Sequence, residues 1–494
     1  MKEYSTKDIR NVVLIGSAKS GKTTLSEAML YEGKVIARRG TVEDKNTVSD
    51  NEEIEKLNQR SIFATPLYAE FMNTKFNVID APGSDDFIGG AVSAFKVCEN
   101  GILVINAQQG VEVGTDIFAR YAEQYKLPMV VAVNQLDSEK ADWEKTLSEM
   151  KETFGHKPIV VQFPVNPGPS FDGFIDVLKM KYYHFKDENG TREDLEIPAD
   201  LKDEAETLRQ ELIEKAAEFD DTLMERFFEQ GSLSEDEIRE GLSIGIRQGG
   251  VLPVFCLSAK KDIGVKRLME FTIKTAVSPA ETKSLTKDGN EIECKAENPT
   301  SIFIYKTDVE PHLGEVSYFK VMSGHLTEGM DLENPETGDK ERLSAIYAVA
   351  GAKKEKVTGL QAGDTGCTVK LRAGKTNMTL SQVGSGISFE HIVFPASKYR
   401  CAIKAESQND ETKLGEALTK ISAQECSTMA ESSMVTTETS SNQVLMVMGF
   451  SSWDMCSFIS SHTSFSEFIG AVPFCSGHYF KMIIAFPCGK VYIF

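Results

Sequence analysis

The chain has 494 residues, of which 41% are hydrophobic and 26% charged, a composition typical of a globular protein with about three domains. Its formal net charge of −20 at pH 7 argues against a protein that coats free nucleic acid by electrostatic attraction, although local basic patches could dock to a ribonucleoprotein. The first residues lack an apolar signal core and no uncharged apolar stretch could cross a bilayer, so we expect a cytosolic protein without membrane contact.

Apolar stretches typical of buried strands alternate with helical segments from residue 10 to about residue 278. We expect the strands at 11–15, 76–80, 101–106, 128–134 and 252–258. This alternation predicts a parallel sheet covered by helices on both faces, an α/β doubly wound domain over residues 1–280. A polar stretch at about 158–250, strongly helical over 200–219, is interpreted as an inserted surface subdomain.

Two further regions follow the first domain. Residues 279–299 are polar, contain Pro and Gly, and are interpreted as a linker. Short alternating strands with Gly turns then predict a β-barrel domain over residues 298–385. Residues 398–494 are predicted to be a partial α+β domain, with a strand at 398–405. The apolar residues of its expected helix are Leu414, Ala417, Leu418 and Ile421.

The composition changes abruptly at about Cys426. From there to Phe494 charged residues are few, Cys, Ser, Met and Phe are frequent, and neither a helical nor a strand period is clean. A reading-frame change followed by a chance stop, a truncated paralogue and a novel interaction tail would each account for this change, and we favour the first. The nine cysteines of the chain show no metal-binding spacing, which predicts buried, reduced thiols.

Residues 16–23, GSAKSGKT, match the GxxxxGK[ST] phosphate-binding motif and stand between a predicted strand and a predicted helix. Its glycines allow the backbone to turn its N–H groups toward phosphates, and the helix N-terminus adds positive potential. We expect Lys22 to neutralise β- and γ-phosphate oxygens and the Thr23 hydroxyl to ligate Mg²⁺. The motif indicates a nucleoside triphosphate without indicating its base, and an ordinary strand-to-helix turn is the alternative.

Residues 77–83, NVIDAPG, end a predicted strand in the pattern DxxG. We expect Asp80 to sense the terminal phosphate through Mg²⁺ and the Gly83 N–H to contact it directly. The side chain after Gly83 then points to where an attacking water would lie. That side chain is Ser84, a poor base, which raises the question of whether the chain hydrolyses a nucleotide or only holds one.

Residues 134–137, NQLD, follow a later strand and predict the base. Asp137 would accept hydrogen bonds from guanine N1–H and the exocyclic amine, whereas adenine would leave this carboxylate unpaired. Asn134 is expected to brace the loop and contact guanine N7, and Ser258-Ala259 to offer a backbone N–H to guanine O6. NxxD alone is more often a surface turn, so the prediction depends on all four motifs occurring in order after predicted strands.

The residues predicted to bind GTP or GDP are Gly16, Ser17, Ala18, Lys19, Ser20, Gly21, Lys22, Thr23, Thr24, Asp80, Gly83, Asn134, Gln135, Asp137, Ser258 and Ala259, with Thr23 and Asp80 as Mg²⁺ ligands.

With these motifs the sequence resembles the translational GTPases, and elongation factor G most closely, from about residue 8 to residue 425. The likeness extends beyond the nucleotide motifs to residues 171–183, 196–238 and 311–330. It implies a ribosome-binding, monomeric factor that uses GTP and Mg²⁺ in translocation. Release factor three and the ribosome-protection proteins share the nucleotide core but are not expected to match the insert so continuously.

The chain departs from that family where the family does its chemistry. Ser17 takes the position of a His and Lys19 that of an Asp in the family's phosphate-binding loop. Ser84 takes the position of the His that positions the hydrolytic water. Lys19 could bring its ammonium near the bridge between the β- and γ-phosphates. It would then recover part of the hydrolysis rate that is lost with the His. The Ser84 position is the first reason to expect slow hydrolysis.

The first switch segment also departs from the family pattern. Residues 60–63 read RSIF in place of RGIT, so Phe63 takes the position of the Thr that ligates Mg²⁺ and cannot itself ligate. Thr65 or Ser61 could substitute only if the loop shifts. We therefore favour a GTP-binding translation factor that hydrolyses GTP poorly. An active ribosome-stimulated GTPase, a ribosome-protection or release-type factor, and a non-functional truncated fragment are the alternatives.

Overall fold

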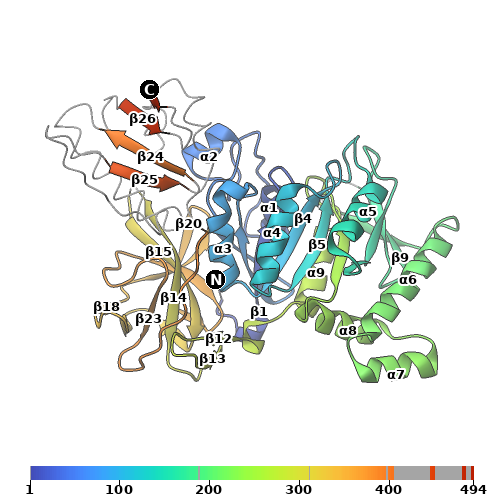
Figure 1. Ribbon diagram of the computed structural model, residues 1–494. Coiled ribbons are helices and arrows are strands. Elements are labelled where there is room, and N and C mark those ends of the chain that lie inside the picture. Colours follow the sequence, from blue (N-terminus) through green and yellow to red (C-terminus); the bar gives the residue numbers. More distant parts are fainter. Residues whose placement is uncertain are drawn as a thin grey trace.

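The computed structural model describes residues 2–186, 190–310 and 312–395, together with strands at 399–404, 446–450, 481–485 and 491–493. A helix-flanked sheet lies beside a domain made of β-strands, and a helical subdomain extends from the far side of the sheet (Figure 1). The predicted fold class, a nucleotide-binding α/β domain with a helical insertion followed by β-rich domains, is confirmed, and the helix of the predicted partial α+β domain lies outside the described residues.

The central sheet has seven strands. Their order is β2 (Thr65–Phe71), β3 (Thr74–Asp80), β1 (Ile9–Ile15), β4 (Asn100–Asn106), β5 (Met129–Asn134), β11 (Leu252–Cys256) and β6 (Pro158–Val160). All neighbours run parallel except β2, which forms an antiparallel hairpin with β3. The five predicted strands are confirmed, and β2 and β6 are additions at the two edges of the sheet.

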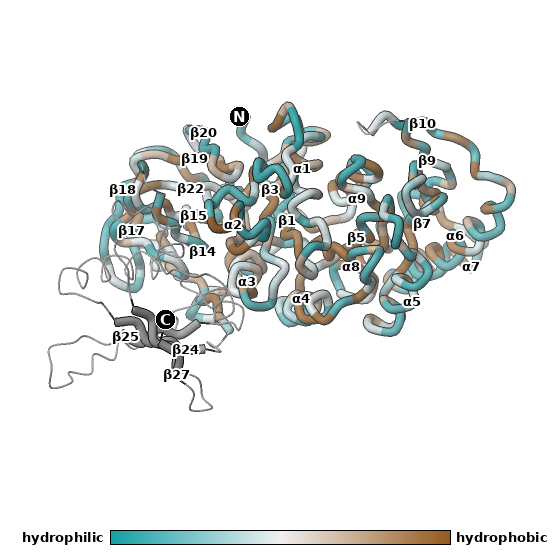
Figure 2. Tube along the Cα trace, turned by 90° about the horizontal axis from the view of Figure 1, so that it is seen from above, coloured by the Kyte–Doolittle hydropathy of each residue, from teal (hydrophilic) through white to brown (hydrophobic). Residues whose placement is uncertain are grey.

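Helices cover both faces of the sheet. Helices α1 (Lys22–Glu32) and α9 (Val265–Thr275) contact each other on one face, and α3 (Ile88–Val97) and α4 (Val113–Gln124) on the other (Figure 2). Helix α5 (Trp143–Phe154) contacts β6, and the short α2 (Glu53–Asn58) lies in the segment between α1 and β2. Strands β4 and β5 are entirely buried, and β1 is buried except at Arg10, which explains the mostly apolar sequences of these strands.

The insertion forms a separate sheet with three helices. Its antiparallel strands are β7 (Gln162–Val165), β8 (Gly173–Asp176), β9 (Lys181–Phe185) and β10 (Arg192–Leu195), followed by α6 (Lys202–Ala217), α7 (Asp221–Gln230) and α8 (Glu235–Arg247). At the predicted start of the insertion, about residue 158, β6 still pairs in parallel with β11 in the central sheet, and the separate sheet begins with β7. Three residues of edge strand are too short to show a period in the sequence.

The barrel domain follows a short connection that is itself structured. Within the predicted linker at 279–299, a 3-10 turn at Pro279–Glu281 leads to a hairpin of β12 (Lys283–Leu285) and β13 (Glu291–Glu293). The barrel strands are β14 (Ser301–Glu310), β15 (Gly314–Ser323), β16 (His325–Thr327), β17 (Asp331–Glu333), β18 (Lys340–Arg342), β19 (Ile346–Ala350), β20 (Lys353–Val357), β21 (Gly359–Gln361), β22 (Thr365–Val369) and β23 (Met378–Gln382).

The last described strands form a four-stranded sheet. Strand β24 (Tyr399–Lys404) confirms the strand predicted at 398–405, and it pairs with β25 (Met446–Phe450) and β26 (Lys481–Ala485), which pairs with β27 (Val491–Ile493). The predicted helix containing Leu414 and the rest of the sequence after Cys426 lie outside the described residues.

Four thiols of the described residues are free and buried as predicted, those of Cys98, Cys256, Cys294 and Cys367. Among the described residues, no helix is both long and apolar enough to cross a membrane.

Buried charges join the barrel to the central sheet. Lys75 Nζ on β3 lies 2.6 Å from Asp364 Oδ1 of the barrel, and both side chains are at most 2% exposed. Asn77 donates to the same carboxylate oxygen at 3.0 Å. Lys320 on β15 pairs with Glu99, next to β4. Since a buried charge left without its partner is strongly destabilising, these contacts hold the two domains in one arrangement.

We expect Lys75→Ala to lower the free energy of unfolding by about 3–5 kcal/mol, because it leaves the Asp364 carboxylate buried without its cation. Lys157→Ala is the control, since Lys157 pairs with Glu123 on the surface, where an ion pair is worth about 1 kcal/mol or less. Denaturant unfolding of both variants measures the difference. Equal decreases in the free energy of unfolding of the two variants would contradict the importance assigned to the buried ion pair.

Candidate functional site

The four predicted motifs meet at one edge of the central sheet. The phosphate-binding loop connects β1 to α1, and the segments after β3, β5 and β11 carry DxxG, NxxD and Ser-Ala. Because the carboxyl ends of parallel strands meet at the same edge, motifs that are far apart in the sequence become neighbours. The predicted site residues therefore gather in one place.

The phosphate-binding loop wraps around the Lys22 side chain. Lys22 Nζ donates to Gly16 O at 2.9 Å and to Ser17 O at 2.8 Å. Burial lowers the pKa of Lys22 to about 8, while the nearby Asp80 and Asp50 carboxylates oppose this shift. Gly16 has a φ of 135°, and a Cβ there would lie 2.2 Å from Val104 O, so this turn requires glycine.

Thr23 and Asp80, the two predicted metal ligands, are in direct contact. Thr23 Oγ1 donates to Asp80 Oδ2 at 2.8 Å, and Ser49 Oγ donates to the same oxygen at 2.6 Å. Asp80 is fully buried, and its Oδ1 has no hydrogen-bond partner. Burial, with a smaller contribution from Asp50, raises the pKa of Asp80 to about 6. A hydroxyl beside an unpaired buried carboxylate oxygen fits the hard oxygen ligands that Mg²⁺ prefers.

The DxxG segment packs directly against the phosphate-binding loop. A Cβ on Gly83 would lie 2.3 Å from Lys22 Nζ and 2.7 Å from the Ala18 amide nitrogen, so only glycine allows this approach. The next residue, Ser84, is 7% exposed and accepts a hydrogen bond from Arg60 Nη2 at 2.6 Å. The contact from Arg60 was not foreseen, because nothing in the residues around Arg60 indicates where its guanidinium points.

Phe63 lies against the barrel. Lys306 Nζ on β14 stands 5.6 Å from the centre of the Phe63 ring and donates to Ala64 O at 3.1 Å. The Glu55 carboxylate of α2 accepts hydrogen bonds from the amides of Ile62 at 2.9 Å and Phe63 at 3.0 Å. The switch segment is thus held from two sides, by a helix of its own domain and by the barrel.

The predicted base-binding residues form one hydrogen-bonded cluster. Asn134 Nδ2 donates to Ser20 O at 3.0 Å and so connects the base-binding loop to the phosphate-binding loop. Asn134 Oδ1 accepts the Ala259 amide at 2.9 Å, so the N–H expected at guanine O6 is engaged with Asn134 in this structure. Ser258 Oγ donates to Asp137 Oδ1 at 2.7 Å and orients this carboxylate.

The remaining predicted residues belong to the phosphate-binding loop or lie next to it. Gln135 Nε2 donates to Lys19 O at 2.9 Å, whereas the Lys19 side chain is exposed. Ser17 Oγ lies 3.0 Å from Thr115 Oγ1 at the start of α4, a contact that the sequence did not indicate. Thr24 is half-buried in the first turn of α1.

Arg39 is a further site residue that sequence reasoning missed. Its Nη1 donates to the carbonyl oxygens of Ala259 and Lys260, both at 3.1 Å, and its guanidinium lies 5.5 Å from the centre of the Tyr31 ring. The segment after α1 therefore reaches over the loop that follows β11. No motif contains Arg39, so only the folded chain shows this contact.

Comparisons with known proteins agree with this site. The family model of the elongation factor Tu GTP binding domain matches residues 7–278, and that of elongation factor G domain 2 matches residues 299–383. Elongation factor G of Thermotoga petrophila and that of Thermotoga neapolitana are each 31% identical over 424 residues, 84% of this chain and 61% of the relative. The chain belongs to the elongation factor G family of translational GTPases. It spans about three fifths of the length of these relatives.

A solved structure supports the same family for this translational GTPase. A crystal structure of a protein from Thermus thermophilus superposes with a TM-score of 0.79 at 28% sequence identity, covering 91% of this chain and 65% of that one. The superposition covers more of the chain than the two matched family models do.

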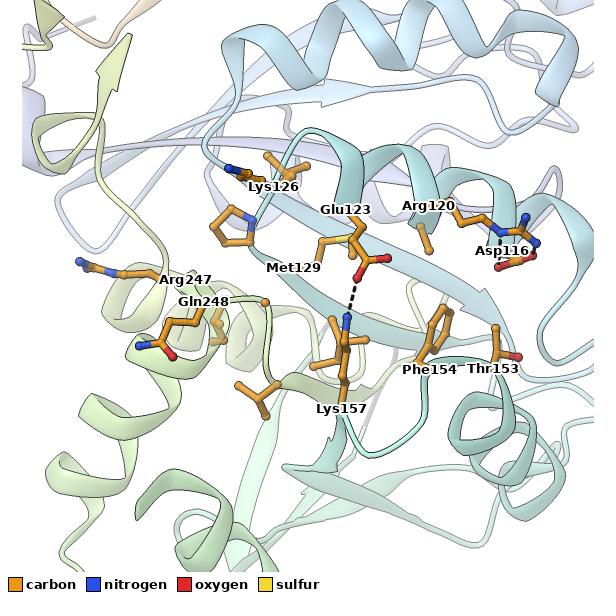
Figure 3. Close-up of a pocket in the computed structure, with 17 residues that line it drawn as sticks. Asp116, Arg120, Glu123, Lys126, Met129, Thr153, Phe154, Lys157, Arg247 and Gln248 are labelled. Carbon is orange, nitrogen blue, oxygen red and sulfur yellow. Dashed lines mark hydrogen bonds and ion pairs between the residues drawn. The ribbon is translucent and has the colours of Figure 1, made fainter. Parts of the chain in front are cut away.

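A cavity lies at the other edge of the sheet. Its volume is about 540 Å³, and α4, α5 and α8 surround the starts of β5 and β11 there (Figure 3). Lys157 pairs with Glu123 across it at 2.7 Å, and Arg120 pairs with Asp116 on its rim. It contains none of the predicted nucleotide-binding residues and faces away from the carboxyl ends of the strands, where ligands of such sheets bind.

Glu55 makes the switch segment sensitive to pH. Burial raises the pKa of this carboxyl to about 8 from an ordinary 4.5. A carboxyl whose pKa is raised on folding binds its proton more tightly in the folded state. The stability that this proton contributes is therefore present below about pH 4.5 and is lost as the pH rises toward 8.

We expect Glu55→Gln to be increasingly stabilising, relative to the unmodified chain, as the pH rises from 5 to 8, because the amide oxygen can still accept the backbone N–H groups without carrying a charge. A difference of one pKa unit between the folded and unfolded states corresponds to about 1.4 kcal/mol in the free energy of unfolding. Glu53→Gln, an exposed change on the same helix, should show no such trend. Unfolding at several pH values measures both, and a pH-independent effect of Glu55→Gln would contradict the raised pKa.

Proposed function

We propose that this translational GTPase is a ribosome-associated, monomeric factor of the translocation type that binds GTP with Mg²⁺ and hydrolyses it slowly. The observation that carries the proposal is the contact of Thr23 with Asp80, whose second oxygen is buried without a partner beside the loop that encloses Lys22. These are the groups that need a phosphate and a hard cation to complete them.

Each phosphate-binding group has a defined task in this proposal. Lys22 exchanges the loop carbonyls that it now contacts for β- and γ-phosphate oxygens. The amides of the loop and of Gly83 donate to the same phosphates, and the N-terminus of α1 favours their negative charge. Thr23 and Asp80 hold Mg²⁺, which neutralises charge on the phosphates when it is bound.

Asp137 selects guanine in this proposal. Ser258 holds one of its oxygens at 2.7 Å, which leaves the other oxygen for the two neighbouring donors of the base. Asn134 ties the base-binding loop to the phosphate-binding loop, so that both ends of the nucleotide meet one connected unit. Gln135 replaces the family's Lys, whose stem packs on the base, and we expect somewhat weaker absolute affinity for that reason.

Slow hydrolysis follows from the groups around Ser84. The Ser84 hydroxyl is a poor base, and the Arg60 guanidinium that donates to it is a hydrogen-bond donor with no acceptor for a proton. The position that carries a His in the family therefore holds a hydroxyl and a cation. Such a site can stabilise charge, but it does not position the water as an imidazole would.

One contact favours the second candidate, an active ribosome-stimulated GTPase. Ser84 Oγ donates to Asp86 Oδ2 at 3.3 Å, and a carboxylate can accept a proton through a hydroxyl. In that case Asp86 would act as the base of the reaction. The two candidate functions predict different effects of Asp86→Asn on the rate of GTP hydrolysis.

We expect GTP and GDP to bind at least about a hundredfold more tightly than ATP, because adenine leaves buried polar groups unpaired. Asp137→Asn should shift the preference toward xanthine nucleotides. Asp142→Asn is the matched control, because Asp142 caps α5 and Asn caps a helix equally well. Competition against labelled GTP measures these preferences, and equal competition by ATP and GTP would remove the guanine assignment.

We expect single-turnover GTP hydrolysis to be about 10³-fold slower than that of an elongation factor G with its His, both with and without ribosomes, since a missing positioning group costs about 10²–10⁴ in rate. Asp86→Asn should leave this slow rate unchanged. Ribosome-stimulated turnover comparable to that of an ordinary elongation factor G, lost in Asp86→Asn, would overturn the proposal in favour of the active GTPase. Cosedimentation with ribosomes in the presence of GTP tests the proposed partner separately.

A further inference from the structure

We propose that the Ser61 hydroxyl is the Mg²⁺ ligand contributed by the switch segment, in place of the family's Thr, whose position Phe63 occupies. This inference rests on the proposed binding of GTP with Mg²⁺ and adds a residue to that site. It also gives the switch segment a metal ligand, which the sequence analysis allowed only with a shift of the loop.

Ser61 lies next to the expected metal ligands. Its Oγ is 3.1 Å from Thr23 Oγ1, which in turn is 2.8 Å from Asp80 Oδ2. Ser61 also hydrogen-bonds the carboxylate of Asp50, and Ser49 Oγ lies 2.6 Å from Asp80 Oδ2. Hydroxyl and carboxylate oxygens from the phosphate-binding helix, the switch segment and the end of β3 thus converge on one point.

Two buried carboxylate oxygens at this point lack a hydrogen-bond partner. They are Asp80 Oδ1 and Asp50 Oδ1, in residues that are 0% and 5% exposed. An unpaired buried carboxylate oxygen is costly, and a bound cation removes that cost. Lys22, whose charge acts on both carboxylates, donates its hydrogen bonds to the loop carbonyls of Gly16 and Ser17. The oxygens are therefore arranged for a small, hard ion.

The contacts that hold Phe63 also hold Ser61 in place. Glu55 accepts the amides of Ile62 and Phe63, directly after Ser61. Lys306 of the barrel covers the Phe63 ring and donates to the carbonyl of Ala64. Hydrogen bonds therefore fix the backbone from Ile62 to Ala64, directly after Ser61. The Ser61 hydroxyl already lies beside Thr23, so no shift of the loop is needed.

Thr65, the other hydroxyl that could substitute, is engaged elsewhere. It lies on β2, and its Oγ1 donates to Ser49 O at 3.1 Å. Its backbone is fixed opposite Asp80 by the pairing of β2 with β3. Thr65 therefore provides a matched control of similar chemistry, only four residues away in the sequence.

The test measures binding of a fluorescent GTP analogue to the full chain as Mg²⁺ is titrated from zero in EDTA-treated buffer. We expect Ser61→Ala to raise the Mg²⁺ concentration for half-maximal enhancement of nucleotide affinity at least about tenfold. Ser61→Thr should stay close to the unmodified chain because it keeps the hydroxyl. Thr65→Val should leave the Mg²⁺ requirement unchanged. Thermal unfolding of each variant checks that it is folded.

A thiolate at the same position provides a gain-of-function test. Thiolates favour soft metals and bind Mg²⁺ poorly. Ser61→Cys should therefore lose Mg²⁺ enhancement and gain enhancement by Cd²⁺, whereas Thr65→Cys should show no change of metal preference. A residue with only a structural role would not exchange one metal for the other.

The outcomes separate this inference from the proposed function. If the unmodified chain binds the GTP analogue equally with Mg²⁺ and with EDTA, the proposed metal site itself is wrong. If Mg²⁺ enhances binding but the Ser61 variants behave like the Thr65 variants, the function stands and the assignment of Ser61 is overturned. A metal preference that changes in Ser61→Cys but not in Thr65→Cys supports Ser61 as the ligand.

Discussion

The structure depends on the ion pair between Lys75 and Asp364, which is buried where the barrel meets the central sheet. Neither charge can be exposed without separating the domains, so the barrel has one position relative to β3. That position brings Lys306 onto Phe63 and the carbonyl of Ala64. The conformation of the switch segment, and with it the location of Ser61, therefore depends on a contact made outside the nucleotide-binding loops.

Burial also explains the electrostatics of the nucleotide site. It lowers the pKa of Lys22 and raises that of Asp80, because a charged group loses its water of hydration in the interior. Each shift favours the neutral form of a group that has to be charged in order to act. Phosphates beside Lys22 and a cation beside Asp80 would reverse both shifts. The site is thus electrostatically incomplete by itself and suited to ligands of both signs.

In the proposed function, nucleotide binding and hydrolysis depend on different parts of this site. Hydrogen bonds connect the phosphate-binding motif to the base-binding cluster through Asn134 and Gln135, and to the DxxG segment through Thr23 and Asp80. The two switch positions that the family uses for chemistry, by contrast, make other contacts. Phe63 packs under Lys306, and Ser84 contacts Arg60. Such a division is what a factor would need if nucleotide binding were retained while the catalytic step was weakened.

The sequence by itself determined the fold class and the nucleotide motifs, because buried parallel strands and a phosphate-binding loop leave short local patterns, such as 101–106 and Gly16 to Thr23. It did not reveal β6, whose three residues are too short for a period, or the contacts of Arg39 and Arg60, whose long side chains reach residues far away in the chain. The location of Ser61 beside Thr23 was decided only by the tertiary structure. It depends on Glu55 and on a lysine of the barrel more than two hundred residues away, and no local pattern encodes contacts between such distant segments.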